Sequence, residues 1–273
     1  MSIFSIIEKF GDVNENNSQG LSRRESLFNL GSIGKDLAMA AVPLSILGII
    51  PKMTSANTLA SKSVLEVLNF ALTLEYLESS FYKEGVDSGV IPAADKAIFD
   101  QIKKHEFSHV AFLQAAITSL GGKPVTSPTF DFTVKGTFKP FSVYEQFLAL
   151  SQAFEDTGVR AYKGQAGNLM SNHAVLTAAL QIHSVEARHA SEVRRLRNKN
   201  GFDASAKGWI TDNSRGTLPA ATQASYDGED NTVQGGVNVK TITTFPMSAV
   251  TEAFDEPLTF DAVLAIATLF IKV

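Results

Sequence analysis

The chain has 273 residues and contains no cysteine. This absence excludes disulfide bonds, thiolate zinc sites, iron–sulfur clusters and cysteine nucleophiles. A metal ion would therefore have to be held by carboxylates and imidazoles, a ligand set that suits iron, manganese or zinc. Phosphate-binding P-loops and serine nucleophile elbows are also missing from the sequence.

Charge and long apolar runs are scarce as well. The formal net charge is −4, and 19% of the residues are charged while 44% are hydrophobic, as is ordinary for a globular protein. This mild acidity offers no footprint for nucleic acid. The apolar stretch from Leu37 to Ile50 is shorter than the roughly 20 residues of a membrane-spanning helix. We therefore expect no nucleic-acid partner and no stable membrane span.

Residues 1–60 are interpreted as an N-terminal extension. Arg23 and Arg24 precede the apolar stretch and a region of small residues, an order that resembles a twin-arginine export signal. The sequence thus predicts export to the periplasm or the extracellular space. The alternative is an amphipathic helix that docks on the core, which would leave the protein in the cytoplasm.

Helical periodicity predicts an all-α four-helix bundle over residues 61–201. We expect the helices at residues 63–83 with an end near Gly85, at 92–120, at 142–166 and at 172–200. Ser142 and Glu145 suit a capping box at the start of the third helix. The connection over residues 121–141 is long enough to cross the bundle lengthwise.

The C-terminal region, residues 202–273, has a different composition. Little periodicity is visible over residues 201–250, so loops and short strands are expected there. The apolar run from Leu258 to Val273 predicts a short fifth helix packed on the bundle. A contact between copies in a homo-oligomer is the alternative use of this run.

An internal repeat with an offset of 80 residues organises the predicted bundle. The offset joins six pairs without a gap: Glu75 and Glu155, Tyr82 and Tyr162, Lys83 and Lys163, Glu106 and Glu186, His109 and His189, and Gly121 and Gly201. Similarity is therefore concentrated on polar residues within apolar runs. Core packing alone would preserve the opposite pattern.

The repeated residues have the spacing of metal ligands. Glu106 with His109, and Glu186 with His189, are both Glu-x-x-His, whose two side chains share one face of a helix. Two-metal sites in bundles combine two such motifs with one Glu from each of the other two helices. Four buried carboxylates without a metal would need extensive pairing. The pattern therefore predicts that the six side chains converge on metal ions.

The run from Leu68 to Glu78 resembles the first helix of the ferritin-like superfamily, in particular the ferritin-like domain family related to plant desiccation-related proteins. The resemblance covers residues 62–200. It implies a ferritin-like bundle with metal ligands at Glu75, Glu106, His109, Glu155, Glu186 and His189. Two Glu-x-x-His motifs are closer to rubrerythrins and bacterioferritins than to animal ferritins, but no Cys-x-x-Cys pair for a rubredoxin module exists.

Other polar residues are expected beside the ligands. Tyr82 and Tyr162 lie two helical turns after Glu75 and Glu155, and they are expected to be core tyrosines whose hydroxyls bond a carboxylate. Orientation of the ligands or a radical relay is the alternative role. His183 is one turn before Glu186 and is expected to bond a ligand, and His105 is a further neighbour. Glu78 is interpreted as a solvated residue rather than as an extra, mobile ligand.

These observations leave several functions open. The first hypothesis is a redox enzyme that uses two iron ions, with manganese as the alternative metal, to oxidise iron with oxygen or to remove peroxide. A metal-stabilised structural or stress-protection protein and a manganese catalase are alternatives. His105 to His109 also matches the His-Glu-x-x-His signature of zinc peptidases. The usual third ligand is missing nearby, which disfavours the peptidase.

Overall fold

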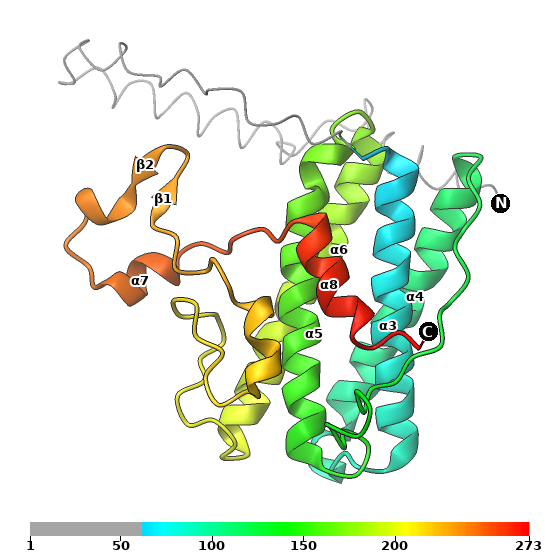
Figure 1. The fold of residues 1–273 in the computed structure, drawn as a ribbon, viewed down its shortest axis with the longest axis horizontal. Coiled ribbons are helices and arrows are strands. Elements are labelled where there is room, and N and C mark those ends of the chain that lie inside the picture. Colours follow the sequence, from blue (N-terminus) through cyan, green and yellow to red (C-terminus); the bar gives the residue numbers. More distant parts are fainter. Residues whose placement is uncertain (1–61, 273) are drawn as a thin grey trace, which may run out of the picture. The chain divides into compact units, whose positions relative to one another are not determined.

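The computed structural model describes residues 62–272, so the proposed export signal lies outside the described residues. Four long helices dominate the described part of the chain (Figure 1). They are α3 (Val64–Ser88), α4 (Ala93–Ser119), α5 (Tyr144–Gln165) and α6 (His173–Lys199). Helix α3 packs on α4 and α5, and α6 packs on the same two helices. The predicted all-α four-helix bundle is confirmed.

Helix α3 begins where the sequence predicts but ends later. Ser63 and Glu66 form a capping box, in which the Ser63 hydroxyl accepts a hydrogen bond from the Glu66 N–H. The helix continues through Gly85 to Ser88 and ends at Gly89, which has a φ of 76°. Gly85 therefore does not stop the helix. A Cβ at this position would lie 2.2 Å from a ring carbon of Phe147, so the glycine permits close packing of α3 on α5.

The predicted capping box at the start of α5 is wrong. The N-cap of α5 is Val143, and no side chain caps the first turn. The Ser142 hydroxyl instead donates to the carbonyl oxygen of Lys139, which also accepts a hydrogen bond from the N–H of Val143. The N–H of Ser142 also donates to this carbonyl oxygen, so a turn of the preceding loop engages Ser142 in place of a capping box.

The sequence repeat is also a repeat of backbone structure. Helices α3 and α5 begin at residues 64 and 144, and helices α4 and α6 span residues 93–119 and 173–199. Gly121 and Gly201, which follow these last two helices, share a φ of 76°. The offset of 80 residues therefore applies to the starts of α3 and α5, to both ends of α4 and α6, and to the turn that ends each repeat, whereas α5 ends earlier than α3 does.

The connection between the two helix pairs runs along the length of the bundle (Figure 1). Its Phe132 is buried beside Phe81 of α3. The C-terminal segment pairs with it: the Asp131 N–H donates to the Phe270 carbonyl at 2.7 Å, and the Lys272 N–H to that of Thr129 at 2.9 Å. The long crossover is thus packed on the core and held by the chain end.

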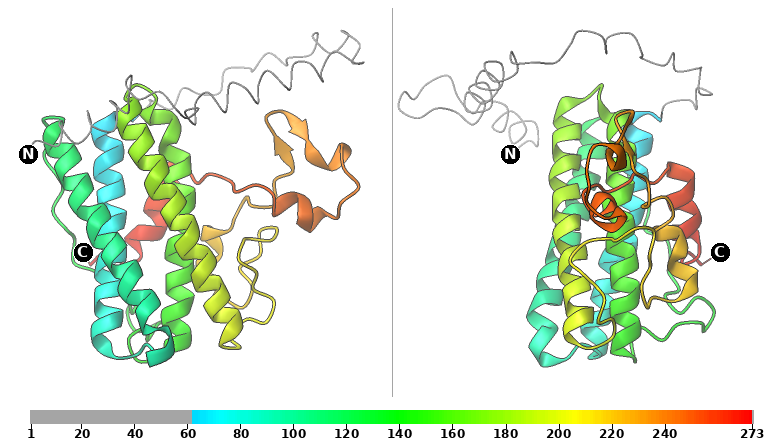
Figure 2. Two further views of the ribbon diagram at one scale, coloured as in Figure 1. Left: turned by 180° about the vertical axis from the view of Figure 1, so that it is seen from behind. Right: turned by 90° about the vertical axis from the view of Figure 1, so that its left-hand side faces the viewer.

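Residues 202–272 are built from loops and short elements. These are the 3-10 helices Ala220–Ser225 and Val239–Thr241, the antiparallel strands β1 (Val233–Gln234) and β2 (Val237–Asn238), α7 (Met247–Thr251) and α8 (Phe260–Thr268). Helix α8 is shorter than the predicted run; it begins after Thr259, whose side chain accepts from the Ala262 N–H, and packs on α5. The β-hairpin and α7 lie outside the four helices (Figure 2).

A buried arginine joins the C-terminal region to the bundle. Arg160 of α5 is 1% exposed and lies 2.7 Å from a carboxylate oxygen of Glu229. Its guanidinium also donates to the carbonyl oxygens of Ser225, Asp227 and Glu256. One side chain thus holds two segments of the irregular region, residues 225–229 and the segment at Glu256. No helix within residues 62–272 is long and apolar enough to span a membrane.

Candidate metal centre

All six residues singled out by the repeat meet inside the bundle. The four glutamates, one from each helix, are fully buried, and the two histidines are 9% and 5% exposed. The set is Glu75 on α3, Glu106 and His109 on α4, Glu155 on α5, and Glu186 and His189 on α6. Carboxylates are seldom buried this deeply unless they are paired or bind a metal.

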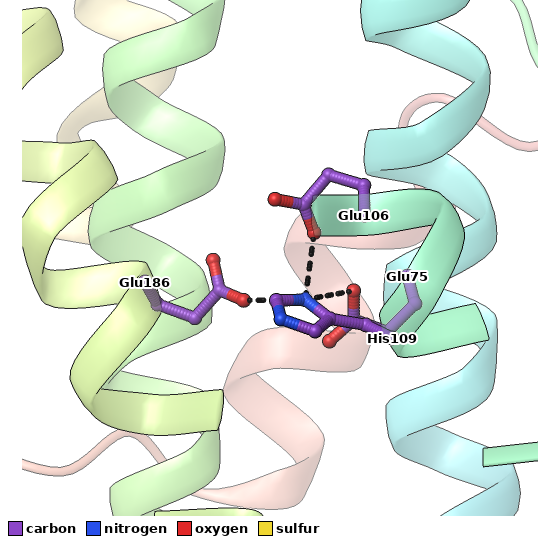
Figure 3. Close-up of side chains that lie close together, drawn as sticks. All are labelled: Glu75, Glu106, His109 and Glu186. Atoms are coloured by element: carbon purple, nitrogen blue, oxygen red, sulfur yellow. Dashed lines mark hydrogen bonds and ion pairs between the residues drawn. The ribbon is translucent and has the colours of Figure 1, made fainter. Parts of the chain in front are cut away.

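The first half of the cluster surrounds His109 (Figure 3). Its Nδ1 lies 3.2 Å from Glu75 Oε2, 3.1 Å from Glu106 Oε2 and 3.2 Å from Glu186 Oε1. One atom from each of these four residues lies within 4.8 Å of the other three. This quartet can hold a metal ion.

The second half surrounds His189. Its Nδ1 lies 3.0 Å from Glu106 Oε1, 3.3 Å from Glu155 Oε2 and 3.7 Å from Glu186 Oε2. These four residues form a second quartet that also lies within 4.8 Å. Glu106 and Glu186 belong to both quartets. Each has one carboxylate oxygen beside His109 and the other beside His189. Glu75 and Glu155 belong to one quartet each.

Several polar atoms of the cluster are unsatisfied within the protein. Among residues 62–272, no hydrogen-bond partner exists for Glu106 Oε1, Glu155 Oε2, both oxygens of Glu186 and His189 Nδ1. The short contacts to His189 Nδ1 therefore lack the geometry of hydrogen bonds. Leaving such atoms buried and unpaired is costly. All of these atoms belong to residues of the second quartet, and a metal ion that binds oxygen and nitrogen would satisfy them.

The metal-free cluster retains protons. Burial and the charge of Glu186 raise the pKa of Glu106 well above its ordinary value. Burial also opposes ionisation of Glu186, but the imidazoles of His109 and His189 outweigh it and lower the pKa of that carboxyl. The two shared carboxylates thus differ in protonation because adjacent like charges cannot both be ionised cheaply. A metal ion would displace the protons.

Burial likewise disfavours charge on the imidazoles. The surrounding carboxylates nevertheless raise the pKa of His109 and His189 above the ordinary value. Burial raises the pKa of Glu155 to about 8, although the neighbouring His189 opposes this shift.

Each predicted tyrosine bonds a glutamate of the other repeat. The Tyr82 hydroxyl donates to Glu155 Oε1 at 2.5 Å, and the Tyr162 hydroxyl donates to Glu75 Oε1. Both tyrosines are buried. The bonded oxygen of each glutamate is fixed by the tyrosine, and its other oxygen lies beside a histidine. The predicted hydrogen bond to a carboxylate is therefore present, but it runs between the repeats rather than within one.

His105 lies on the outer side of His189. Its Nδ1 is 2.8 Å from His189 Nε2, its Nε2 is 2.6 Å from Gln101, and the two imidazole rings are stacked. Both ring nitrogens of His105 are thus engaged away from His109, which disfavours the zinc peptidase arrangement. An open groove of about 450 Å³ is lined by His105, His189 and Arg188. The groove therefore connects the protein surface with His189 of the cluster.

Two predictions about neighbouring residues are wrong. The imidazole of His183 does not bond a ligand; its Nδ1 lies 2.9 Å from the backbone carbonyl oxygen of Val159 on α5. Glu78 is not solvated, because it is 4% exposed and lies among the carboxylates of the cluster. A charged residue in a helix is typical of the protein surface, and the burial of Glu78 is evident only from the helix packing.

Helix order, crossover and the carboxylate–histidine cluster together define a ferritin-like bundle. The chain belongs to the ferritin-like domain family, whose model matches residues 63–199. No curated protein matches the chain. The matched residues include all four long helices and all six residues of the cluster. The narrower resemblance to desiccation-related proteins stays a prediction.

Proposed function

We propose that this protein is a di-iron carboxylate oxidoreductase that oxidises Fe(II) with oxygen or removes peroxide. The observation that carries the proposal is the sharing of Glu106 and Glu186 by two adjacent quartets. A shared carboxylate can bind one metal ion through each oxygen, so this arrangement suits a pair of ions. Four carboxylates would balance the charge of two divalent ions, and two imidazoles complete the set.

Two bound iron ions would supply the redox chemistry. Oxidised from Fe(II) to Fe(III), the pair would provide two electrons, enough with two protons to convert one O₂ to H₂O₂ or one H₂O₂ to two waters. The protein residues have separate tasks. Tyr82 and Tyr162 fix the orientation of Glu155 and Glu75. His105 holds the outer nitrogen of His189, which directs the inner nitrogen towards the carboxylates.

The test uses full-length protein stripped of metal and loaded with Fe(II) without oxygen. We expect two irons per chain, and rapid growth of near-ultraviolet absorbance when oxygen or peroxide is added. Glu106→Gln and Glu186→Gln should each bind less than two irons and lose this rapid phase. Glu84→Gln, at an exposed position of α3, is the matched control and should behave as wild type. Oxidation no faster than that of free iron would refute the enzymatic proposal.

A structural metal site is the second candidate, and the depth of burial favours it. The six side chains are at most 9% exposed, so ions bound at the two quartets would together link all four helices. In that case iron would raise the thermal stability of the protein without oxidation above the background. Rapid peroxide removal by manganese-loaded protein but not by iron-loaded protein would instead identify a catalase.

A further inference from the structure

The two repeats differ at one position inside the cluster. Glu78, one turn after Glu75 on α3, corresponds in the repeat to Gly158 on α5. Glu78 is a fifth buried carboxylate, and no acidic residue balances it on the other side. The cluster is therefore symmetric in its six repeated residues and asymmetric in this pair.

Gly158 leaves room for the Glu78 carboxylate. A Cβ at position 158 would lie 3.2 Å from Glu78 Oε1 and 3.7 Å from Glu186 Oε2. The two carboxylates therefore approach the same bare stretch of α5. A cavity of about 20 Å³, enough for one water molecule, borders Glu78, Thr157 and Gly158. Unfilled volume therefore lies directly beside the Glu78 side chain.

Glu78 lies on the side of the second quartet. Glu186 Oε2, the oxygen near Gly158, is also the oxygen that faces His189 rather than His109. After burial itself, the charges of Glu186 and Glu155 contribute most to raising the pKa of Glu78, and that of Glu75 contributes least among the four cluster glutamates. The position of Glu78 and its electrostatic environment therefore both indicate the side of the cluster where Glu155 and His189 lie.

We propose that Glu78 is a fifth carboxylate ligand, which joins Glu155, Glu186 and His189 around one of the two metal positions and makes the two positions unequal. The inference rests on the proposed two-metal function. A carboxylate that binds at only one of the two metal positions gives that position more negative charge and a further oxygen donor. That metal ion is therefore bound more tightly than its partner.

Manganese binding tests this asymmetry without any need for turnover. Free Mn(II) is followed by electron paramagnetic resonance while metal-free, full-length protein is titrated. We expect two unequal binding steps for wild type. Glu78→Gln should weaken the tighter step by about 10-fold or more, so that the two steps converge. In Mössbauer spectra of protein loaded with ⁵⁷Fe(II), two distinct signals should likewise merge towards one.

Two further variants separate position from charge. Gly158→Ala keeps every carboxylate but places a methyl group against Glu78 Oε1, and it should shift the tighter step in the same direction. Glu84→Gln, exposed on the same helix as Glu78, should change neither step. Circular dichroism checks the fold of each variant, and Glu78→Asp replaces Glu78→Gln if that variant unfolds.

The outcomes distinguish this inference from the function on which it rests. If wild type binds two ions and oxidises iron but Glu78→Gln keeps both affinities and both Mössbauer signals, the assignment of Glu78 is overturned and the di-iron proposal stands. If wild type itself fails to bind two ions, both fall.

Discussion

Removal of the metal is expected to make this protein less stable as pH rises from 5 to 8. The pKa of Glu155 is raised from the ordinary value of 4.5 to about 8, chiefly by burial. Between these values the folded chain keeps a proton that the unfolded chain has released, so stability falls with rising pH. The raised pKa values of His109 and His189 act in the same direction above pH 6.5.

The size of the effect follows from the shift. One pKa unit corresponds to about 1.4 kcal/mol, so Glu155 alone should remove about 3 kcal/mol of unfolding free energy between pH 5 and 8. Bound metal should reverse the trend because it replaces the protons, and its affinity rises as pH rises. The contrast between metal-free and metal-loaded protein is therefore the signature of the cluster.

Urea unfolding followed by circular dichroism measures this dependence on chelator-treated protein. Glu155→Gln keeps an oxygen for the Tyr82 hydroxyl but cannot ionise, so its stability should depend less on pH. Glu145→Gln, exposed on the same helix, is the control and should retain the wild-type slope. A metal-free wild type whose stability is constant or rises over this range would refute the reasoning.

Three other changes have defined outcomes. Tyr82→Phe and Tyr162→Phe each free one carboxylate from its orienting bond and should weaken metal binding by about 10- to 100-fold, measured by Mn(II) titration. Arg160→Met leaves its buried carboxylate partner unpaired and should lower the unfolding free energy by about 3–5 kcal/mol in urea. Replacement of Arg23 and Arg24 by Lys should retain the protein in the cytoplasm of its host, as fractionation would show.

Matched variants make these outcomes decisive. Tyr144→Phe loses a hydrogen bond to Asp95, outside the cluster, and should leave metal affinity unchanged. Arg195→Met, at an exposed position of α6, should change stability by less than about 0.5 kcal/mol. Metal affinity equal to wild type in both cluster tyrosine variants would contradict the orienting role. Unchanged export of the Lys variant would contradict the twin-arginine interpretation.

The bundle was predictable because its signals are local and occur twice. Helical periodicity gives four long helices, and Glu-x-x-His places two side chains on one helix face wherever the helix packs. The common offset then indicates that Glu75 and Glu155 face the same interior as the motifs. This pattern alone was sufficient to predict that the six side chains converge.

Features that depend on contacts between helices were not predictable in this way. Gly85 resembles a helix stop until Phe147 of another helix is seen against it. Glu78 resembles a surface residue until α5 covers it at Gly158. Arg160 lies in a helix that is buried along most of its length, and its partners come from a region 65–96 residues further along the chain. Each of these residues is explained by a neighbour that is distant in sequence.

The long crossover joins the two helical hairpins in one chain, and this allows the hairpins to differ in sequence. A dimer of two identical helical hairpins would carry every residue in duplicate, so a glutamate at position 78 would face a second glutamate in place of Gly158. Likewise, His105 would be matched by a second histidine where this chain has Val185. In a single polypeptide, the two hairpins can carry different residues at matching positions. The connecting segment therefore allows Glu78 and the His105 contact to the surface groove to be present in one repeat without a counterpart in the other.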